Sequence, residues 1–252
     1  MLNRIVHGTP TDLPPLLIVH GLYGSARNWG VIAKRLSDDR QVLAVDMRNH
    51  GQSPWQPTHS YPDLADDLAE LIASIGGPVD MVGHSMGGKA AMMLALRHPD
   101  ALRRLVVADI APVKYTHSQL PFIETMRAVD LGKVTRRSDA AEQLAALGVE
   151  PALQSFFTQS LDIAAKEWRL NLDVLAQAMP EIMDFPQVQS RWEGPVLFLT
   201  GGDSDYVQAD HRPAIRALFP RARFAKIPGA GHWLHADKPR EFEASVRAFL
   251  TA

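Results

Sequence analysis

The stretch from residue 79 to residue 97 decides the fold, and it reads VDMVGHSMGGKAAMMLALR. Its opening apolar residues predict a short buried strand, and Met86–Arg97 predicts a helix that Pro99 ends. Between them, Gly83-His84-Ser85-Met86-Gly87 fits the pattern G-x-S-x-G, in which a serine occupies a sharp strand-to-helix turn. Glycines remove the side chains that would clash where such a turn brings neighbouring segments together. Ser85 is therefore the predicted nucleophile.

The segments before this turn alternate short apolar runs with amphipathic helical patterns. Tyr61–Ile75 is the clearest helix, because its leucines and isoleucines fall on one face and Gly76-Gly77 follow it. This rhythm predicts an α/β protein with a mostly parallel sheet flanked by helices. The expected buried strands are Leu16–His20, Gln41–Asp46, Val79–Gly83 and Leu105–Asp109.

After Pro112 the alternation stops, and only helical spacings are found as far as Arg191. It returns with expected strands at Pro195–Thr200 and Arg223–Ile227 and a closing helix around Arg240–Leu250. We therefore expect one α/β core, residues 1–112 and 192–252, interrupted by a helical lid at 113–191. No Pro/Ser-rich linker suggests a separate domain.

Composition narrows the class of protein. The 252 residues carry a formal net charge of −2 and are 46% hydrophobic, which gives no reason to expect a nucleic-acid or membrane partner. The absence of cysteine excludes disulfides, thiolate metal sites and a cysteine nucleophile. No His-x-x-x-His pattern or acidic cluster suggests a metal, and no cofactor is expected. Residues 1–15 do not resemble a signal peptide, so we expect a cytoplasmic enzyme.

The base expected beside Ser85 is His232, which ends the segment Pro228-Gly-Ala-Gly-His232 after the last expected strand. A neutral imidazole there can take the serine proton and return it to a leaving group. Among the other histidines, His84 is expected to pack away from the site, and His50 and His235 are candidates for the pocket border.

Two aspartates could orient His232. Asp205 follows the expected strand Pro195–Thr200, and Asp109 ends the strand Leu105–Asp109. Either could instead be a turn residue that caps backbone amides, and Ser204 could hydrogen-bond the acid. Residue type and position alone leave both candidates open.

An oxyanion needs two hydrogen-bond donors, one after the nucleophile and one from an earlier loop. The Met86 amide is the expected first donor. His20-Gly-Leu-Tyr-Gly24 ends a strand and turns tightly, so the Leu22 amide is the expected second donor, with Tyr23 as the alternative.

Taken together, these motifs resemble the YbfF-like bacterial esterases of the α/β-hydrolase superfamily. The resemblance covers nearly the whole chain and implies an α/β-hydrolase fold with the lid inserted after the sixth strand. It also implies a carboxylesterase with some acyl-CoA thioesterase capacity. The motifs are His20-Gly-Leu-Tyr-Gly24, Asp46-Met-Arg-Asn-His-Gly-Gln-Ser53, Gly83-His-Ser-Met-Gly-Gly-Lys89, Asp109-Ile-Ala-Pro112 and Gly229-Ala-Gly-His-Trp-Leu-His-Ala236.

The resemblance favours Asp109 as the acid, because the similar esterases lack an aspartate where Asp205 stands. The presence of Asp205 here is a departure that restores the commoner arrangement of the superfamily, so it remains the alternative.

The lid is expected to build its own core and to line an acyl pocket over the sheet. Its apolar residues are Phe122, Met126, Phe156, Phe157, Leu161, Trp168, Leu172, Met179 and Met183. The cations Lys89, Arg127, Arg136 and Arg137 are interpreted as solvated surface charge rather than as contacts to a CoA phosphate.

The expected function is hydrolysis of a small-molecule ester or thioester through an acyl-enzyme on Ser85. The alternatives are C–C bond, enol-lactone or perhydrolase chemistry on the same triad, or a ligand receptor without catalysis. The Ser85/His232 pair argues against a receptor, which needs neither residue.

Overall fold

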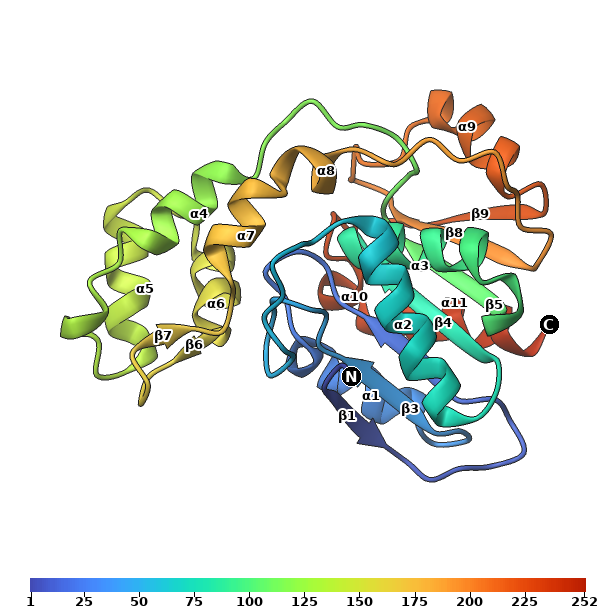
Figure 1. The fold of residues 1–252 in the computed structure, drawn as a ribbon, viewed down its shortest axis with the longest axis horizontal. Helices are drawn as coiled ribbons and strands as arrows, with labels where there is room; N and C mark the ends of the chain where they lie inside the picture. Colours follow the sequence, from blue (N-terminus) through green and yellow to red (C-terminus); the bar gives the residue numbers. More distant parts are fainter.

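A single seven-stranded sheet forms the centre of the computed structural model, which describes residues 1–252 (Figure 1). Its strand order is β1-β3-β2-β4-β5-β8-β9, and only β1 runs antiparallel to its neighbour. The strands are β1 (Arg4–His7), β2 (Leu16–Val19), β3 (Val42–Val45), β4 (Val79–His84), β5 (Leu102–Ala108), β8 (Val196–Gly201) and β9 (Ala222–Ile227).

Alternate side chains of the central strands point to opposite faces of this sheet. In β2, Leu17 and Val19 join one apolar core, whereas Leu16 and Ile18 join the other. The first face is covered by α2 (Tyr61–Ile75), α3 (Met86–Arg97) and α9 (Arg212–Leu218). The second is covered by α1 (Gly30–Leu36), α10 (Leu234–Asp237) and α11 (Pro239–Thr251).

The expected core elements are present with small shifts at their ends. The predicted helix Tyr61–Ile75 matches α2, with Ser60 as its N-cap and Gly76 in the left-handed region at its C-cap. The edge strand β1 was not predicted, because its residues are at least partly exposed and form no apolar run. As an edge strand, β1 pairs with β3 on one side and has no strand on the other.

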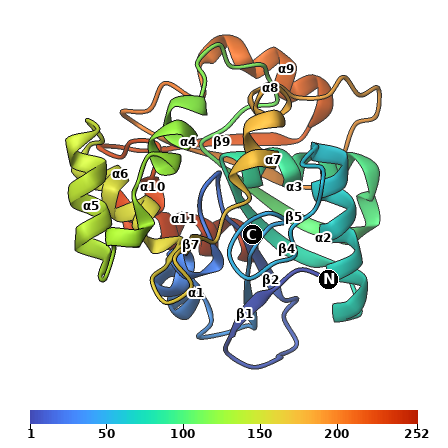
Figure 2. The same cartoon turned by 60° about the vertical axis from the view of Figure 1, so that its left-hand side comes forward.

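The segment between β5 and β8 forms a separate group of helices beside the carboxyl ends of the strands (Figures 1 and 2). We call residues 113–191 the insertion. Its elements are α4 (Leu120–Arg127), α5 (Arg137–Ala146), α6 (Pro151–Gln159), α7 (Leu172–Gln177), α8 (Met179–Met183) and a hairpin of β6 (Leu161–Asp162) with β7 (Glu167–Trp168).

Two details of the insertion differ from the expectations. It follows the fifth strand of the chain rather than the sixth, because only β1 to β5 precede it. It also contains the β6–β7 hairpin, although no strand was expected there. Each of these strands has only two residues, which is too short to leave a periodic pattern in the sequence.

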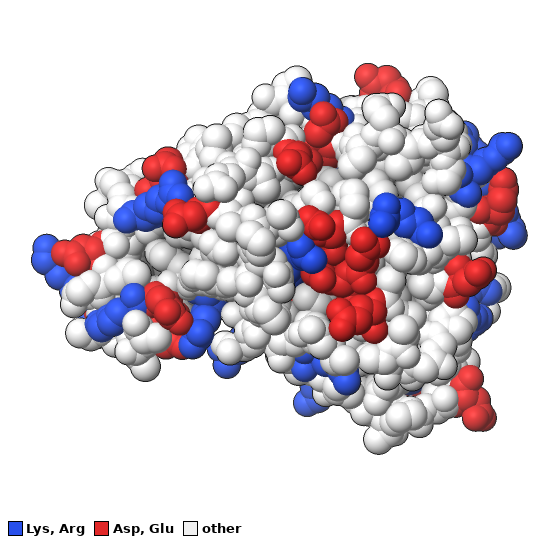
Figure 3. All heavy atoms as spheres, viewed as in Figure 1, with Lys and Arg blue, Asp and Glu red and all other residues white.

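A group of acidic side chains stands out near the centre of the face in Figure 3. The acidic side chains that gather there lie over α2, where Asp63 and Asp67 pair with Arg48 and Asp66 pairs with Arg97. None of the helices has the length and apolar character that a bilayer span requires.

Candidate active site

Ser85 occupies the turn between β4 and α3, as its motif predicts. Its φ of 52° and ψ of −122° are strained for a residue with a side chain. The turn is possible because the neighbouring glycines allow close backbone contact. A Cβ on Gly83 would lie 2.5 Å from the Gly87 carbonyl oxygen, and one on Gly87 would lie 2.4 Å from the His20 carbonyl oxygen.

His232 reaches the serine from the loop between β9 and α10. Its Nε2 lies 3.1 Å from Ser85 Oγ, and its side chain is 22% exposed. The ring of Tyr206 stacks on the imidazole, with centroids 3.8 Å apart and planes 16° apart. The expectation for His84 was wrong, because its Nε2 lies 2.8 Å from the His232 carbonyl oxygen and its ring lines the site.

The structure places Asp109 at the other nitrogen of this imidazole. Asp109 Oδ2 lies 2.8 Å from His232 Nδ1, and the carboxylate is fully buried. Ser204 donates its hydroxyl to the same oxygen, and the Gly201 amide donates to Oδ1 at 3.0 Å. These donors stabilise a charged carboxylate that points at the imidazole.

Asp205 does not approach this cluster. Its side chain is exposed to solvent, and it forms no hydrogen bond or ion pair with His232. The register of the sheet explains the difference, because β4 and β5 pair His84 with Ala108. The residues that follow, Ser85 and Asp109, therefore leave the sheet at the same level, and both have a φ of 52°.

The two predicted oxyanion donors, the amides of Leu22 and Met86, belong to residues that line the same cavity as Ser85. Met86 is the first residue of α3, so its amide has no partner within the helix. The amide of Tyr23, the alternative donor, instead points to His50 Nε2 at 3.2 Å. It is therefore occupied, which leaves the Leu22 amide as the available donor on this loop.

Buried histidines support both loops that carry these amides. His20 Nε2 accepts from the Met47 amide at 3.0 Å, and His59 Nε2 lies 3.3 Å from Met86 Sδ. Burial lowers the pKa of His59 to about 3, and it also lowers the pKa values of His20, His50, His84 and His235. These rings therefore stay neutral near pH 7, and their nitrogens can accept hydrogen bonds. Of the two proposed pocket-border residues, His235 lines the cavity and His50 lies behind it.

A cavity of about 280 Å³ opens above Ser85 between the sheet and the insertion. Of the apolar residues expected from the insertion, Phe122, Phe156, Phe157 and Met183 line it. Others, such as Met126 and Trp168, are buried in the interior of the insertion. Several lining residues were not predicted, because helical spacing cannot say which apolar side faces the substrate and the loops after β8 and β9 carry no spacing at all. These are Leu153, Ile182, Tyr206 and Trp233.

The four cations interpreted as solvated charge have different environments. Arg127 pairs with Glu124 and Asp173, and Arg136 pairs with Asp139. Arg137 is exposed and donates to two carbonyls of the insertion. For Lys89 the interpretation was wrong, since only 1% of this residue is exposed.

No group of three or more potential metal ligands is assembled in the structure.

Comparison with known proteins shows the family and the fold of the chain. The alpha/beta hydrolase family model matches residues 16–245. The sn-1-specific diacylglycerol lipase ABHD11 of Mus musculus is 44% identical over 249 residues, covering 94% of this chain and 81% of that protein. Esterase YbfF of Escherichia coli K12 is 39% identical over 240 residues, covering 94% and 92%. A solved marine microorganism esterase superposes with a TM-score of 0.92 at 36% identity, covering 98% of both chains.

The chain therefore belongs to the α/β-hydrolase family, and the resemblance to the YbfF-like esterases is confirmed. The relatives and the shared fold define it as an enzyme of the esterase and lipase type.

Proposed function

We propose that this enzyme hydrolyses carboxylic esters through a covalent acyl intermediate on Ser85. The observation that carries the proposal is the continuous contact from Ser85 Oγ through His232 to Asp109, at the base of a mainly apolar cavity. A nucleophile, its base and the acid that orients the base are thus within hydrogen-bond reach of one another.

In the first half-reaction, His232 Nε2 removes the Ser85 hydroxyl proton as Oγ attacks the ester carbonyl carbon. The carbonyl oxygen becomes negatively charged and receives hydrogen bonds from the amides of Leu22 and Met86. When the tetrahedral intermediate collapses, the C–O bond to the alcohol breaks. The imidazolium returns its proton to the departing oxygen, which leaves acyl-Ser85 and a neutral alcohol.

In the second half-reaction, water attacks the acyl-enzyme as His232 removes one of its protons. Collapse breaks the bond to Ser85 Oγ, which regains a proton from the imidazolium, and the carboxylic acid is released. Asp109 keeps the Nδ1 proton on the imidazole and stabilises the positive charge that forms twice in each cycle. Asp205 has no part in this proposal.

The substrate class follows from the cavity. Most of the residues that line it are hydrophobic, so we propose an apolar acyl group bound under residues 113–191. In this reading the insertion acts as a lid on the core of residues 1–112 and 192–252. The similar mouse protein ABHD11 is described as a diacylglycerol lipase. We therefore include acylglycerols, besides simple esters and thioesters, among the candidate substrates.

The test is hydrolysis of p-nitrophenyl esters from acetate to palmitate, combined with labelling by a fluorophosphonate probe. The wild type should turn over at least part of the series and take up the probe, and Ser85→Ala should do neither while unfolding at the same temperature. Ser155→Ala, an exposed serine on α6, is the matched control and should behave as wild type. Turnover or labelling that survives in Ser85→Ala would overturn the proposal.

A further inference from the structure

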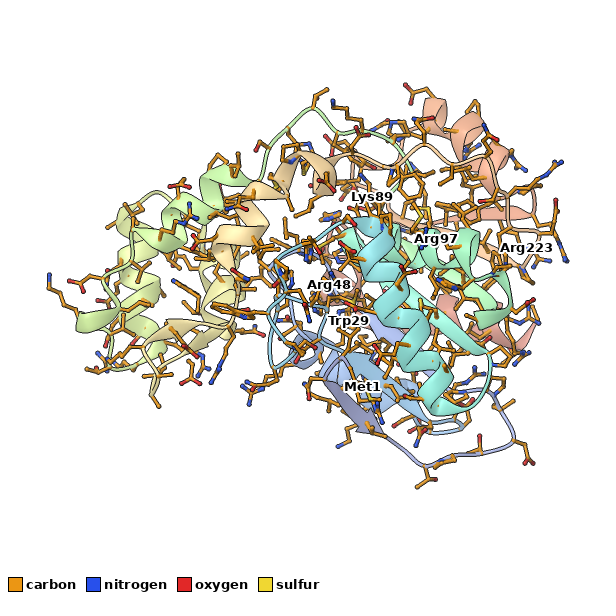
Figure 4. All side chains as sticks on the ribbon, in the orientation of Figure 1. Met1, Trp29, Arg48, Lys89, Arg97 and Arg223 are labelled. Carbon is orange, nitrogen blue, oxygen red and sulfur yellow. The ribbon has the colours of Figure 1, made fainter.

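Lys89 is a buried lysine one helical turn from the nucleophile. Its backbone amide donates to the Ser85 carbonyl at 3.0 Å, and Figure 4 shows it at the end of α3 that lies toward the insertion. Its Nζ donates to the carbonyl oxygens of Val113 at 2.9 Å, Met183 at 3.2 Å and Asp184 at 2.7 Å. An ammonium has three N–H groups, and here each has an acceptor.

The three acceptors lie in the two segments by which the insertion joins the core. Val113 is at its start, and Met183 and Asp184 follow one another at the end of α8. The Tyr115 amide also donates to the Met183 carbonyl at 2.8 Å, so the two segments are in contact. One side chain on the nucleophile helix therefore holds both connections of the insertion.

Two aromatic rings and one carboxylate near Nζ favour its positive charge. The ring centroids of Tyr115 and Tyr61 lie 4.8 Å and 5.7 Å away, and the Asp184 carboxylate also acts on it favourably. Against these, burial lowers the pKa of Lys89 to about 7. A neutral amine has only two N–H groups, so deprotonation leaves one of the three carbonyls without its donor. Burial raises the pKa values of Tyr61 and Tyr115, so neither hydroxyl ionises in the same range.

These contacts reach the substrate cavity directly. Ile182 and Met183, the last residues of α8, form part of its wall, and the Lys89 side chain lines it beside them. Tyr61 supports the same wall, because its hydroxyl donates to the Ile182 carbonyl at 2.7 Å. The distance between Ser85 and this wall therefore depends on how α2 and α3 hold the end of α8.

We propose that Lys89 is a positioning residue that holds the Ile182–Met183 wall at a set distance from Ser85 and thereby limits the length of the acyl chain. This inference rests on the proposed ester hydrolysis and adds the origin of its chain-length preference. Lys89 does not touch the reacting atoms; it acts through the backbone carbonyls of the insertion.

The test compares Lys89→Met with Lys114→Met on the p-nitrophenyl series. Lys114 is exposed, lies next to Val113 and is the matched control. In Lys89→Met the wall loses its fixed position, so kcat/KM for laurate relative to acetate should rise by about tenfold. The ratio compares two substrates of the same variant, so a loss of kcat that is equal for all esters leaves it unchanged. Lys114→Met should show the wild-type ratio.

A second variant and a pH series keep the test decisive if Lys89→Met does not fold. Tyr61→Phe removes the hydroxyl that holds Ile182 and should raise the laurate-to-acetate ratio by about threefold. In the wild type this ratio should rise as the pH increases through about 7, whereas Lys89→Met should show no such step. Lys89→Arg keeps the charge and should restore part of the wild-type ratio.

An unchanged ratio in Tyr61→Phe and a flat pH series, or an equal loss on every chain length, would overturn the positioning role. Those results leave ester hydrolysis by the wild type intact. They are therefore distinct from failure of the proposed function, which would appear as turnover that survives Ser85→Ala.

Discussion

The carboxyl edge of the sheet and the insertion enclose the same cavity, but they are held in different ways. At the sheet edge, Ser85 and Asp109 each follow a residue of a paired parallel ladder, so backbone hydrogen bonds set their separation. The insertion is held at its two connecting segments by the side chains of Lys89 and Tyr61, and farther along the chain by an isolated backbone bridge between His50 and Leu170. We therefore expect changes at the edge to abolish the chemistry and changes in the insertion to alter substrate preference.

The largest effect is expected for the acid at the sheet edge. Asp109→Asn should lower kcat by about 10⁴, because the amide cannot hold the required imidazole tautomer or stabilise the imidazolium. Asp205→Asn is the matched control and should stay within about twofold of wild type, since its carboxylate is exposed and unpaired with His232. Steady-state kinetics on a single p-nitrophenyl ester measures the kcat of both variants. A collapse in Asp205→Asn instead would reverse the assignment of the acid.

The close backbone contact at the nucleophile turn should be the next most sensitive feature. In Gly87→Ala the new methyl would lie 2.4 Å from the His20 carbonyl oxygen and 2.6 Å from that of Val19. We expect a loss of about 3 kcal/mol in the free energy of unfolding, measured by urea denaturation. Gly77→Ala has no atom within 4 Å of the added methyl, so its change should be within about 1 kcal/mol. Equal stability of the two variants would contradict the close-packing argument.

Acid should weaken the edge through its buried histidines. Unfolded His59 binds a proton below its ordinary pKa of 6.5, whereas the folded ring does so only near 3, so stability is lost as the pH falls between these values. Between pH 7 and pH 5 this ring alone should cost about 2 kcal/mol of unfolding free energy. The glutamine of His59→Gln cannot be protonated, so this variant should lose about 2 kcal/mol less unfolding free energy than wild type between pH 7 and pH 5. His117→Gln, at an exposed position, should lose as much as wild type. Parallel pH curves for wild type and His59→Gln would exclude this contribution.

The smallest effect is expected within the insertion. Phe156 lines the cavity and is half-buried, with its ring centroid 5.6 Å from that of Trp233. Phe156→Ala should raise KM for long-chain esters by about tenfold, as expected for partial loss of an aromatic contact, with kcat for acetate nearly unchanged. Leu147→Ala, an exposed position outside the cavity, is the control. A fall in acetate kcat as large as that in Asp109→Asn would remove the distinction between the two regions.

The success of the sequence reasoning also differs between these regions. Buried parallel strands leave continuous apolar runs, and a strained turn requires glycines, so β4, α3 and Ser85 were all readable from one stretch of residues. The insertion leaves only helical spacing, which does not separate cavity-lining Phe156 from interior Met126. The burial of Lys89 was not expected, because a lysine side chain normally lies in solvent and its acceptors are far from it in the chain.

The sequence by itself determined the α/β class, the nucleophile turn, the histidine after the last strand and the pair of aspartates that could serve it. These features depend on local periodicity and on residues adjacent in the chain. Only the tertiary structure decided that Asp109 rather than Asp205 contacts His232, that His50 occupies the Tyr23 amide, and that Lys89 contacts both segments that connect the insertion to the core. Each of these depends on the sheet register or on contacts between segments far apart in the chain, and no local pattern of residues encodes such distances.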